Sequence, residues 1–442
     1  MVLGDRGYVF TLLTALMVML ILSMTSFYSE VAAPSYDDTN KKISLVELHY
    51  FVESLKKDAT RAISISSQRA ATYATDHIIV TNETFRNYGM KNCTEFRYFA
   101  NGSEAAIAEL MVCGTLNAAK QPVGDISIYM ENNTVTYWIG RTNAKRQGIR
   151  YKTTVFMRNM TMALYDPWHY IVVTEMDFFI EDEAGGNIYR GTKVPLTSVV
   201  DVTSLEDPMQ HAHFGVPTSV RTYRRCEPSI VVNGSVLESW IDRGCYLPSS
   251  KDYNAPSYFD RLEGNTNLSM KFLERSWDML RVYNYTTDEI GLESLMDLDL
   301  VQAYNVSVNL NLSQVDYMYW GGEDGRCTVD DMKRHSGFKI DFNHGMKYQV
   351  KGLVCRIDVG YDIFETRDSI NPREITVPKG TTILWVEKTG TEHKLWAPEA
   401  WEGEVALTPG GSHQWTFPEP RDYTITSTPP DNNYGVQVIH VV

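Results

Sequence analysis

Residues 8–27 read YVFTLLTALMVMLILSMTSF, twenty consecutive residues without a charged side chain. As an α-helix rising ~1.5 Å per residue, this run is long enough to cross the ~30 Å hydrocarbon layer of a membrane. It is longer than the ~7–15 apolar residues of an ordinary cleaved secretory signal, although Val31-Ala32-Ala33 imitates a cleavage site just before Pro34. The run therefore predicts a retained N-terminal helix that holds the rest of the chain outside the cytoplasm.

Length and charge restrict the function further. The chain has 442 residues, of which 43% are hydrophobic and 22% charged, which is typical of folded domains. The formal net charge is −14. A chain this acidic is expected neither to bind nucleic acid, which requires clustered Lys and Arg, nor to be held by charge on anionic lipids.

Ten asparagines begin an N-x-[ST] sequence, the acceptor of N-linked glycans, which is more than Ser and Thr frequency alone would produce. The excess predicts an exported glycoprotein whose glycans cover the middle of the chain. The ten positions are Asn82, Asn92, Asn101, Asn132, Asn159, Asn233, Asn267, Asn284, Asn305 and Asn311.

The six cysteines support the same compartment. They fall into three local couples, Cys93 with Cys113, Cys226 with Cys245, and Cys327 with Cys355, although six cysteines allow fifteen pairings. No C-x-x-C spacing occurs, so structural disulfides in an oxidising space are expected instead of zinc or thiol redox chemistry.

Four regions are predicted. Residues 1–30 form the N-terminal tail and transmembrane or pilin-like helix. Residues 31–75 form a stalk in which a short polar stretch, 32–42, precedes an amphipathic helix with apolar residues at three- and four-residue steps from Leu45 to Ala62. A β-rich ectodomain occupies residues 76–358, with a possible break into subdomains near 208–217, and a β-sandwich occupies residues 359–442.

The expected fold class is α+β, mostly β. Within the middle region, residues 170–180 and 187–196 have the β-branched and aromatic content of a hairpin, and 306–313 alternate like a half-buried strand. Residues 276–282 and 290–298 read as helices. In the tail, ITVPKGTTILWVEK, TPGGSHQWTF, EPRDYTIT and YGVQVIHVV are short strands separated by Pro and Gly turns.

The tail resembles the cupredoxin (plastocyanin-like) family over roughly 80 residues. The matching segments are 372–382, 385–388, His393, 409–412 and Tyr423-Thr424. The resemblance implies a Greek-key β-sandwich of cupredoxin type, with His393 at the family's first histidine ligand.

The other copper ligands do not carry over. Ser427 stands in place of the cysteine, Pro430 in place of the second histidine and Asn433 near the methionine, while His413 is unsuitably placed. A type 1 copper site needs a thiolate and two imidazoles, so no metal or other cofactor is expected.

The N-terminus resembles the class III signal of archaeal type IV pilin-like proteins, in which Arg6 and Gly7 directly precede the apolar helix and processing leaves Tyr8 first. In that family the helix lies in a filament core. The resemblance implies self-association through Leu12, Leu13, Leu16, Leu20 and Ile21. Residues 166–168, 261–265 and 291–294 are similar to archaeal surface proteins, a likeness that names no activity.

Other polar groups are expected to have structural roles and not catalytic or metal-binding ones. His211 and His213 are expected as a solvated loop pair, and Glu181-Asp182-Glu183 as a solvated hairpin tip. Residues 166–169 are expected to form a turn with Trp168 buried. No G-x-S-x-G, G-x-G-x-x-G or P-loop pattern occurs, so neither a nucleophile elbow nor a nucleotide site is indicated.

The expected function is therefore non-enzymatic. The chain reads as a cell-surface structural subunit, either a pilin-like filament component or an anchored adhesion protein, with a copper-free cupredoxin-like contact domain. One alternative is an anchored metal-binding or electron-transfer cupredoxin. Another is a membrane-bound exoenzyme whose site a single sequence does not reveal.

Overall fold

The computed structural model describes residues 5–90, 98, 100–116, 130–144, 150–183, 186, 188–215, 221–282, 288–362, 367–428 and 435–442. The chain forms two compact units. The first comprises residues 1–63, 135–160 and 173–198, and the second comprises residues 64–134, 161–172 and 199–442.

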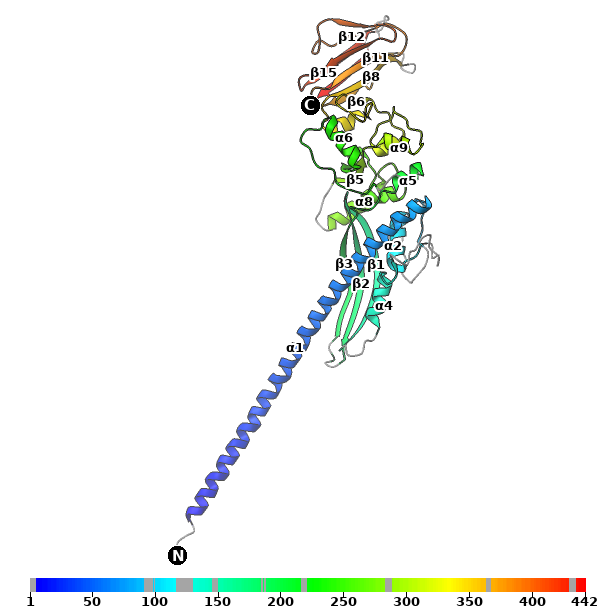
Figure 1. The fold of residues 1–442 in the computed structure, drawn as a ribbon. Helices are drawn as coiled ribbons and strands as arrows, with labels where there is room; N and C mark the ends of the chain where they lie inside the picture. The colour runs from blue at the N-terminus through cyan, green and yellow to red at the C-terminus, as the bar shows by residue number, and fades with distance from the viewer. Residues whose placement is uncertain are drawn as a thin grey trace. The chain divides into compact units, whose positions relative to one another are not determined.

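Helix α1 runs without interruption from Asp5 to Thr81, 77 residues in all (Figure 1). The expected division into an anchor helix and a stalk helix, separated by the polar stretch 32–42, is therefore wrong. Polar residues cost a helix only ~0.7 kcal/mol or less each, and a helix nucleated on both sides propagates through them. The same helix continues through Pro34.

The two ends of α1 meet different environments. Residues 11–28 are apolar, with a mean hydropathy of 1.8, and none of them is buried. Farther along, Leu48 and Val52 pack with Ile180 in the first unit, as the amphipathic pattern predicted, although Leu45 is exposed. In the second unit, the small residues Ala70 and Ala74 are fully buried.

The predicted hairpin is confirmed and belongs to a three-stranded sheet. Strands β1 (Tyr151–Asp166), β2 (His169–Asp182) and β3 (Ile188–Asp201) lie in that order. The expected turn between β1 and β2 is also confirmed, because the Asp166 carboxylate accepts the N–H of Trp168 and the Trp168 side chain is buried.

The rest of the middle region is more helical than expected. Several of the short helices begin at a side-chain cap, as where Ser257 and Asp260 form a capping box at the start of α7. The elements are α2 (Ser103–Cys113), α4 (Val135–Asn143), α5 (Met209–Phe214), α6 (Gly234–Arg243), β4 (Tyr246–Ser250), η1 (Lys251–Tyr253), α7 (Tyr258–Leu262), α8 (Met270–Val282), β5 (Glu289–Ser294), α9 (Leu298–Ala303), α10 (Asp316–Gly321) and α11 (Phe342–Lys347).

Helix α8 confirms the prediction for 276–282, but two neighbouring predictions are wrong. Residues 290–298 do not form a helix, because β5 pairs with β4 and is buried on both faces, which erases the alternation that marks a strand. Residues 306–313 are not a strand. Val306 and Val308 instead pack on a small cluster around Met296 and Tyr319.

Two sheets make up the C-terminal region, and the strands predicted there are confirmed. One has the order β10-β16-β15-β12-β13, and the other β14-β11-β8-β6-β7, with β9 paired to β8. Their strands are β6 (Cys327–Val329), β7 (Lys339–Ile340), β8 (Leu353–Asp362), β9 (Arg367–Asn371), β10 (Glu374–Val377), β11 (Thr382–Glu387), β12 (His393–Trp396), β13 (Glu404–Leu407), β14 (Ser412–Thr416), β15 (Asp422–Thr428) and β16 (Gly435–Val441).

One hydrophobic core serves both sheets. It includes Ile357 and Trp385 from one sheet and Leu395, Ile425 and Ile439 from the other. The expected domain boundary at residue 359 falls inside β8, and β6 and β7 extend the same sheet. Residues 209–214 at the expected subdomain break form helix α5.

Two of the expected disulfides are present, Cys226–Cys245 and Cys327–Cys355. Cys113 is also disulfide-bonded, while Cys93, its expected partner, lies outside the described residues. The Cys327–Cys355 bond joins directly opposed positions of β6 and β8, so it fastens the strands that precede residue 359 to the C-terminal sheet.

Candidate functional site

The region around His393 is where the resemblance to cupredoxins implies a metal ligand. His393 opens β12, and its side chain is 1% exposed. Its Nε2 lies 2.9 Å from the Thr389 hydroxyl and 3.0 Å from the Thr391 hydroxyl. The Glu387 carboxylate is 3.7 Å away. The imidazole is thus held by hydroxyl groups of the turn between β11 and β12.

Glu387 fastens that turn to a second one. Its Oε1 accepts the backbone N–H of Thr389, the Thr389 hydroxyl at 2.6 Å and the N–H of Gly390 at 2.8 Å. Its Oε2 accepts the N–H of Gly410 at 2.7 Å, in the turn between β13 and β14. Burial alone would raise the pKa of Glu387, but these hydrogen bonds outweigh it and lower the pKa to about 2.

Ser427, which stands where the family has its cysteine, is fully buried in β15 opposite Leu395 of β12. The adjoining pair, Thr428 and Lys394, brings the end of β15 beside the start of β12. Pro430 and Asn433 lie outside the described residues. The structure therefore places the strand that carries Ser427 beside the strand that His393 opens.

The residues present do not fit a type 1 copper ion. The chain has no cysteine after Cys355, which is itself disulfide-bonded, so no thiolate is available. The two oxygens of Glu387 are already occupied by N–H and O–H donors. His413 lies in β14, with its ring stacked on that of Trp385 at 6.1 Å and edge-to-face with that of Trp401 at 5.0 Å. Hydrogen bonds from Thr389, Thr391 and Gly410 hold this region together.

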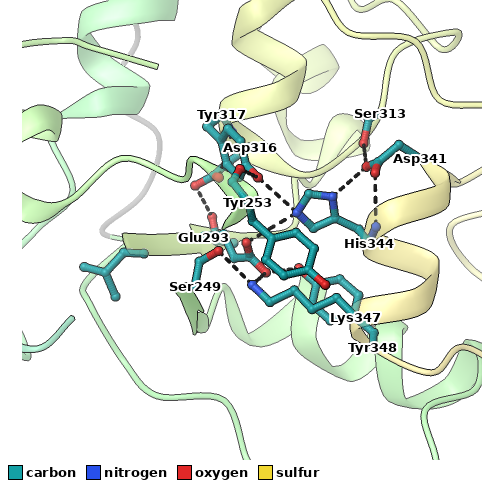
Figure 2. Close-up of polar contacts among 12 residues, drawn as sticks. Ser249, Tyr253, Glu293, Ser313, Asp316, Tyr317, Asp341, His344, Lys347 and Tyr348 are labelled. Atoms are coloured by element: carbon teal, nitrogen blue, oxygen red, sulfur yellow. Dashed lines mark hydrogen bonds and ion pairs between the residues drawn. The ribbon is translucent and has the colours of Figure 1, made fainter. Parts of the chain in front are cut away.

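A second group of polar residues is a buried ionic cluster of Glu293, Asp341, His344 and Lys347, which Figure 2 shows in close-up. His344 Nδ1 lies 2.7 Å from Asp341 Oδ2, and His344 Nε2 lies 3.4 Å from Glu293 Oε2. Lys347 Nζ lies 2.6 Å from Glu293 Oε1 and 2.8 Å from the Ser249 hydroxyl. Two negative and two positive groups therefore balance one another.

The pKa values in the cluster follow from this pairing. Burial would lower the pKa of His344, but its hydrogen bonds to Asp341 and Glu293 raise it to about 9. Burial would raise the pKa of Glu293, but the His344 hydrogen bond and the charges of His344 and Lys347 lower it to about 2. At neutral pH the histidine is protonated and the glutamate is ionised.

An Asp–His pair can serve as a catalytic base, but this one cannot meet a substrate. The side chains of His344 and Glu293 are 2% and 0% exposed. Each is surrounded by protein groups, including the hydroxyls of Tyr317 and Tyr348. The cluster joins η1, β5, α10 and α11, so its role is to fix these elements in one arrangement.

A second buried network continues this pattern. The Arg261 guanidinium, fully buried, lies 2.6 Å from Asp207 and 2.8 Å from Asp316. The hydroxyls of Tyr223 and Tyr246 donate to Asp207. Sequence analysis singled out the runs that contain Arg261 and Glu293 but assigned them no role, because their partners lie tens of residues away in the chain.

Two sequence expectations about polar residues are wrong. His211 and His213 lie on helix α5 and not in a loop. His211 is buried and faces Glu206 at 3.6 Å, whereas His213 is exposed, as expected, and its ring stacks 5.0 Å from that of Trp320. Asp182 is buried, not solvated, because Arg150 binds both its oxygens at 2.6 and 2.5 Å.

Three further residues could hold a cation, since the ligand atoms of Asp297, Asp299 and His335 lie within 4.8 Å of one another. Protein contacts explain this grouping. Asp297 caps helix α9 through the N–H of Leu300, and His335 lies 3.4 Å from Asp299 and 3.2 Å from Asp242.

Most of the predicted glycosylation sites that the structure describes are exposed: Asn82, Asn101, Asn132, Asn159, Asn267, Asn305 and Asn311. Asn233 is half-buried, and its side chain caps helix α6. Asn92 and Asn284 lie outside the described residues. Arg6, Gly7 and Tyr8 lie within α1, and the predicted assembly residues Leu12, Leu13, Leu16, Leu20 and Ile21 are 50–60% exposed.

Comparisons with known proteins find similarity only among solved structures. No protein-family model matches the sequence, and no curated protein matches it. A purple cupredoxin from Nitrosopumilus maritimus is 18% identical, with 20% of this chain and 98% of that chain covered and a TM-score of 0.17. Auracyanin from Roseiflexus castenholzii is 20% identical (20% and 96% covered, TM-score 0.16), and amicyanin from Paracoccus versutus is 19% identical (20% and 81% covered, TM-score 0.16).

Proposed function

We propose that this chain is a non-enzymatic structural protein of the cell surface. Its N-terminal helix anchors it in a membrane or in the core of a pilin-like filament, and its C-terminal sheets form a copper-free contact domain of cupredoxin type. The single observation that carries the proposal is the apolar segment 11–28 of α1, which is long enough to span a bilayer and has no buried residue.

The disulfides support the placement of the folded part. Cys226–Cys245 and Cys327–Cys355 are stable in an oxidising space such as the cell exterior. The exposed N-x-[ST] asparagines are consistent with export as a glycoprotein. An exposed apolar helix joined to a disulfide-bonded body is what an anchored ectoprotein or a filament subunit requires.

The copper-free character rests on the missing thiolate. Ser427 occupies the position that the resemblance assigns to the cysteine ligand, and Cys327 and Cys355 are joined in a disulfide. The Nε2 contacts of His393 and the hydrogen bonds of Glu387 hold the two turns of this region together. The domain is therefore suited to contact with a neighbouring molecule and not to electron transfer.

The anchor is tested by alkaline extraction of membranes from cells that produce the full chain. The wild type should stay in the membrane pellet or in sedimenting filaments. Leu16→Lys with Leu20→Lys should release it to the soluble fraction, since each charge costs ~2.5–3.5 kcal/mol near the centre of a spanning helix. Leu45→Lys with Tyr50→Lys, at exposed positions of the same helix outside the apolar segment, is the matched control.

Wild-type protein in the soluble fraction would refute the anchor. Negative-stain images of the sedimented material then separate a filament from a single membrane anchor. Copper titration of the purified protein tests the alternative function: an intense thiolate–copper absorption band would show that the chain is an electron-transfer cupredoxin after all.

A further inference from the structure

The outer face of the six-stranded sheet carries a hollow of about 490 Å³. Its floor is formed by Thr328 of β6, Val354 of β8 and Leu384 of β11. Thr328 lies opposite Val354, and Leu384 lies opposite Arg356, so these side chains stand on the same side of the sheet. Val354 and Leu384 are partly buried, and the part of each side chain that remains accessible gives the hollow an aliphatic floor.

Three cationic residues and two aspartates, Asp324 and Asp358, border this floor, which leaves one net positive charge on a chain that is strongly acidic as a whole. The three cationic residues are Arg326, Lys339 and Arg356. Arg356 is 47% exposed and contacts Asp358 through Nε at 3.2 Å, which leaves most of its five N–H donors facing the hollow or solvent. Arg326 donates from one Nη to the Asn371 carbonyl at 3.1 Å.

Asn311 lies at the border of the same hollow, and its position is fixed. Lys339 Nζ donates to its Oδ1 at 2.9 Å. Its carbonyl accepts the N–H of Gly325 at 2.8 Å, and its N–H donates to the Asn309 side chain at 3.0 Å. These contacts occupy Oδ1. They do not involve Nδ2, which is the atom to which an N-linked sugar is joined.

We propose that the hollow is the seat of an N-linked glycan carried by Asn311, so that the first sugars lie over the outer face of the sheet instead of extending into solvent. The proposal rests on the proposed function, because it needs an exported, glycosylated chain. Asn311 begins the sequence Asn311-Leu312-Ser313, which meets the acceptor rule.

The chemistry of the hollow matches sugar. A pyranose ring presents an aliphatic C–H face and a rim of hydroxyl oxygens. The accessible parts of the Val354 and Leu384 side chains can pack against the C–H face. Lys339 and Arg356 carry only donors, which sugar hydroxyl oxygens accept. A covalently tethered ligand also needs little intrinsic affinity, because its attachment supplies a high effective concentration.

The test measures how fast Arg356 reacts with phenylglyoxal in the full chain produced by a glycosylating host, read by peptide mass spectrometry. Arg243 is a matched internal reference, since it is 48% exposed and paired with one carboxylate, Glu227. Asn311→Gln should make Arg356 react severalfold faster and leave Arg243 unchanged. Asn267→Gln, which removes an acceptor elsewhere, should change neither rate.

Enzymatic trimming of the glycans on the folded wild type should accelerate Arg356 in the same way, so the result does not depend on how the variant folds. If Asn311 carries a glycan but Arg356 reacts equally with and without it, the seat is refuted and the surface-glycoprotein proposal stands. If only Asn311 lacks a glycan, the seat alone fails. If no acceptor asparagine is modified, both the proposal that the chain is glycosylated and the proposal that a glycan covers the hollow are refuted. The membrane anchor is tested separately by the extraction experiment.

Discussion

At the residue scale, Glu387 shows how one buried carboxylate can hold two turns together. Its two oxygens accept donors from the turn after β11 and from the turn before β14. Because the side chain is buried, each lost hydrogen bond would leave an unsatisfied N–H, which costs ~1–3 kcal/mol. One ionised group therefore does locally what several separate contacts would do.

Glu387→Gln should lower the free energy of unfolding by about 1–3 kcal/mol. The amide keeps the shape of the side chain, but its NH₂ must face backbone N–H donors on one of the two sides. The measurement is urea unfolding at pH 7. Glu404→Gln, which removes only the surface ion pair with Lys394, should change stability by less than ~1 kcal/mol. Equal stability of wild type and Glu387→Gln would mean that the carboxylate does not hold the turns together.

His344 makes stability depend on alkaline pH. Its folded-state pKa of about 9 lies above the ordinary histidine value, so the protonated form stabilises the fold. That contribution is complete below pH ~6.5 and is lost as the pH rises through about 9.

Thermal unfolding between pH 6 and pH 10 should therefore show a falling melting temperature above neutrality in the wild type. His344→Gln should be less stable at pH 7 and should lose that part of the pH dependence. A variant whose profile runs parallel to the wild type would show that another group is responsible.

At the element scale, α1 and β5 show that burial decides whether an element can be recognised from its sequence. The apolar segment of α1 is exposed on all sides, and its character is plain in the sequence. β5 is buried on both faces between β4 and neighbouring segments, so its residues show no alternation. A strand is recognised from its period only when one of its faces meets water.

The Cys327–Cys355 disulfide belongs to this scale, since it links β6 to β8 across a sequence separation of 28 residues. Replacing both cysteines by serine should lower the free energy of unfolding by roughly 3–4 kcal/mol, because the unfolded chain regains the freedom of that loop. Guanidinium unfolding measures the loss. Reduction of the wild type should cost at least as much, since it opens the other disulfides as well. A double variant as stable as the oxidised wild type would contradict this account.

At the scale of the whole molecule, the two compact units are defined by contacts and not by successive stretches of sequence. Each is assembled from three segments, and α1 contributes to both. In the second unit, the Arg261 network and the Glu293 cluster tie the helices of the middle region to one another. Removing one partner from such a buried pair costs about 3–5 kcal/mol, which makes these networks strong determinants of a single arrangement.

The sequence by itself determined the features that depend on local composition. These are the apolar N-terminal helix, the hairpin of β2 and β3, and the strands around the Pro-Lys-Gly and Pro-Gly-Gly turns; the sequence grouped the cysteines into local couples, but the structure decided the pairings Cys226–Cys245 and Cys327–Cys355. Each of these elements is set by hydrophobic length, period or turn residues, which neighbouring residues are sufficient to specify. The sequence also shows directly that position 427 carries a serine and therefore no thiolate.

Only the tertiary structure decided the rest. It made α1 continuous, placed β5 in a sheet, and assembled charged residues such as Asp207, Arg261 and Asp316 in the interior. The physical reason is that a buried charge is stable only beside its partner, and that partner comes from a distant part of the chain. Glu387, five residues from His393, looked like an ordinary surface acid until the fold brought Gly410 to its other oxygen.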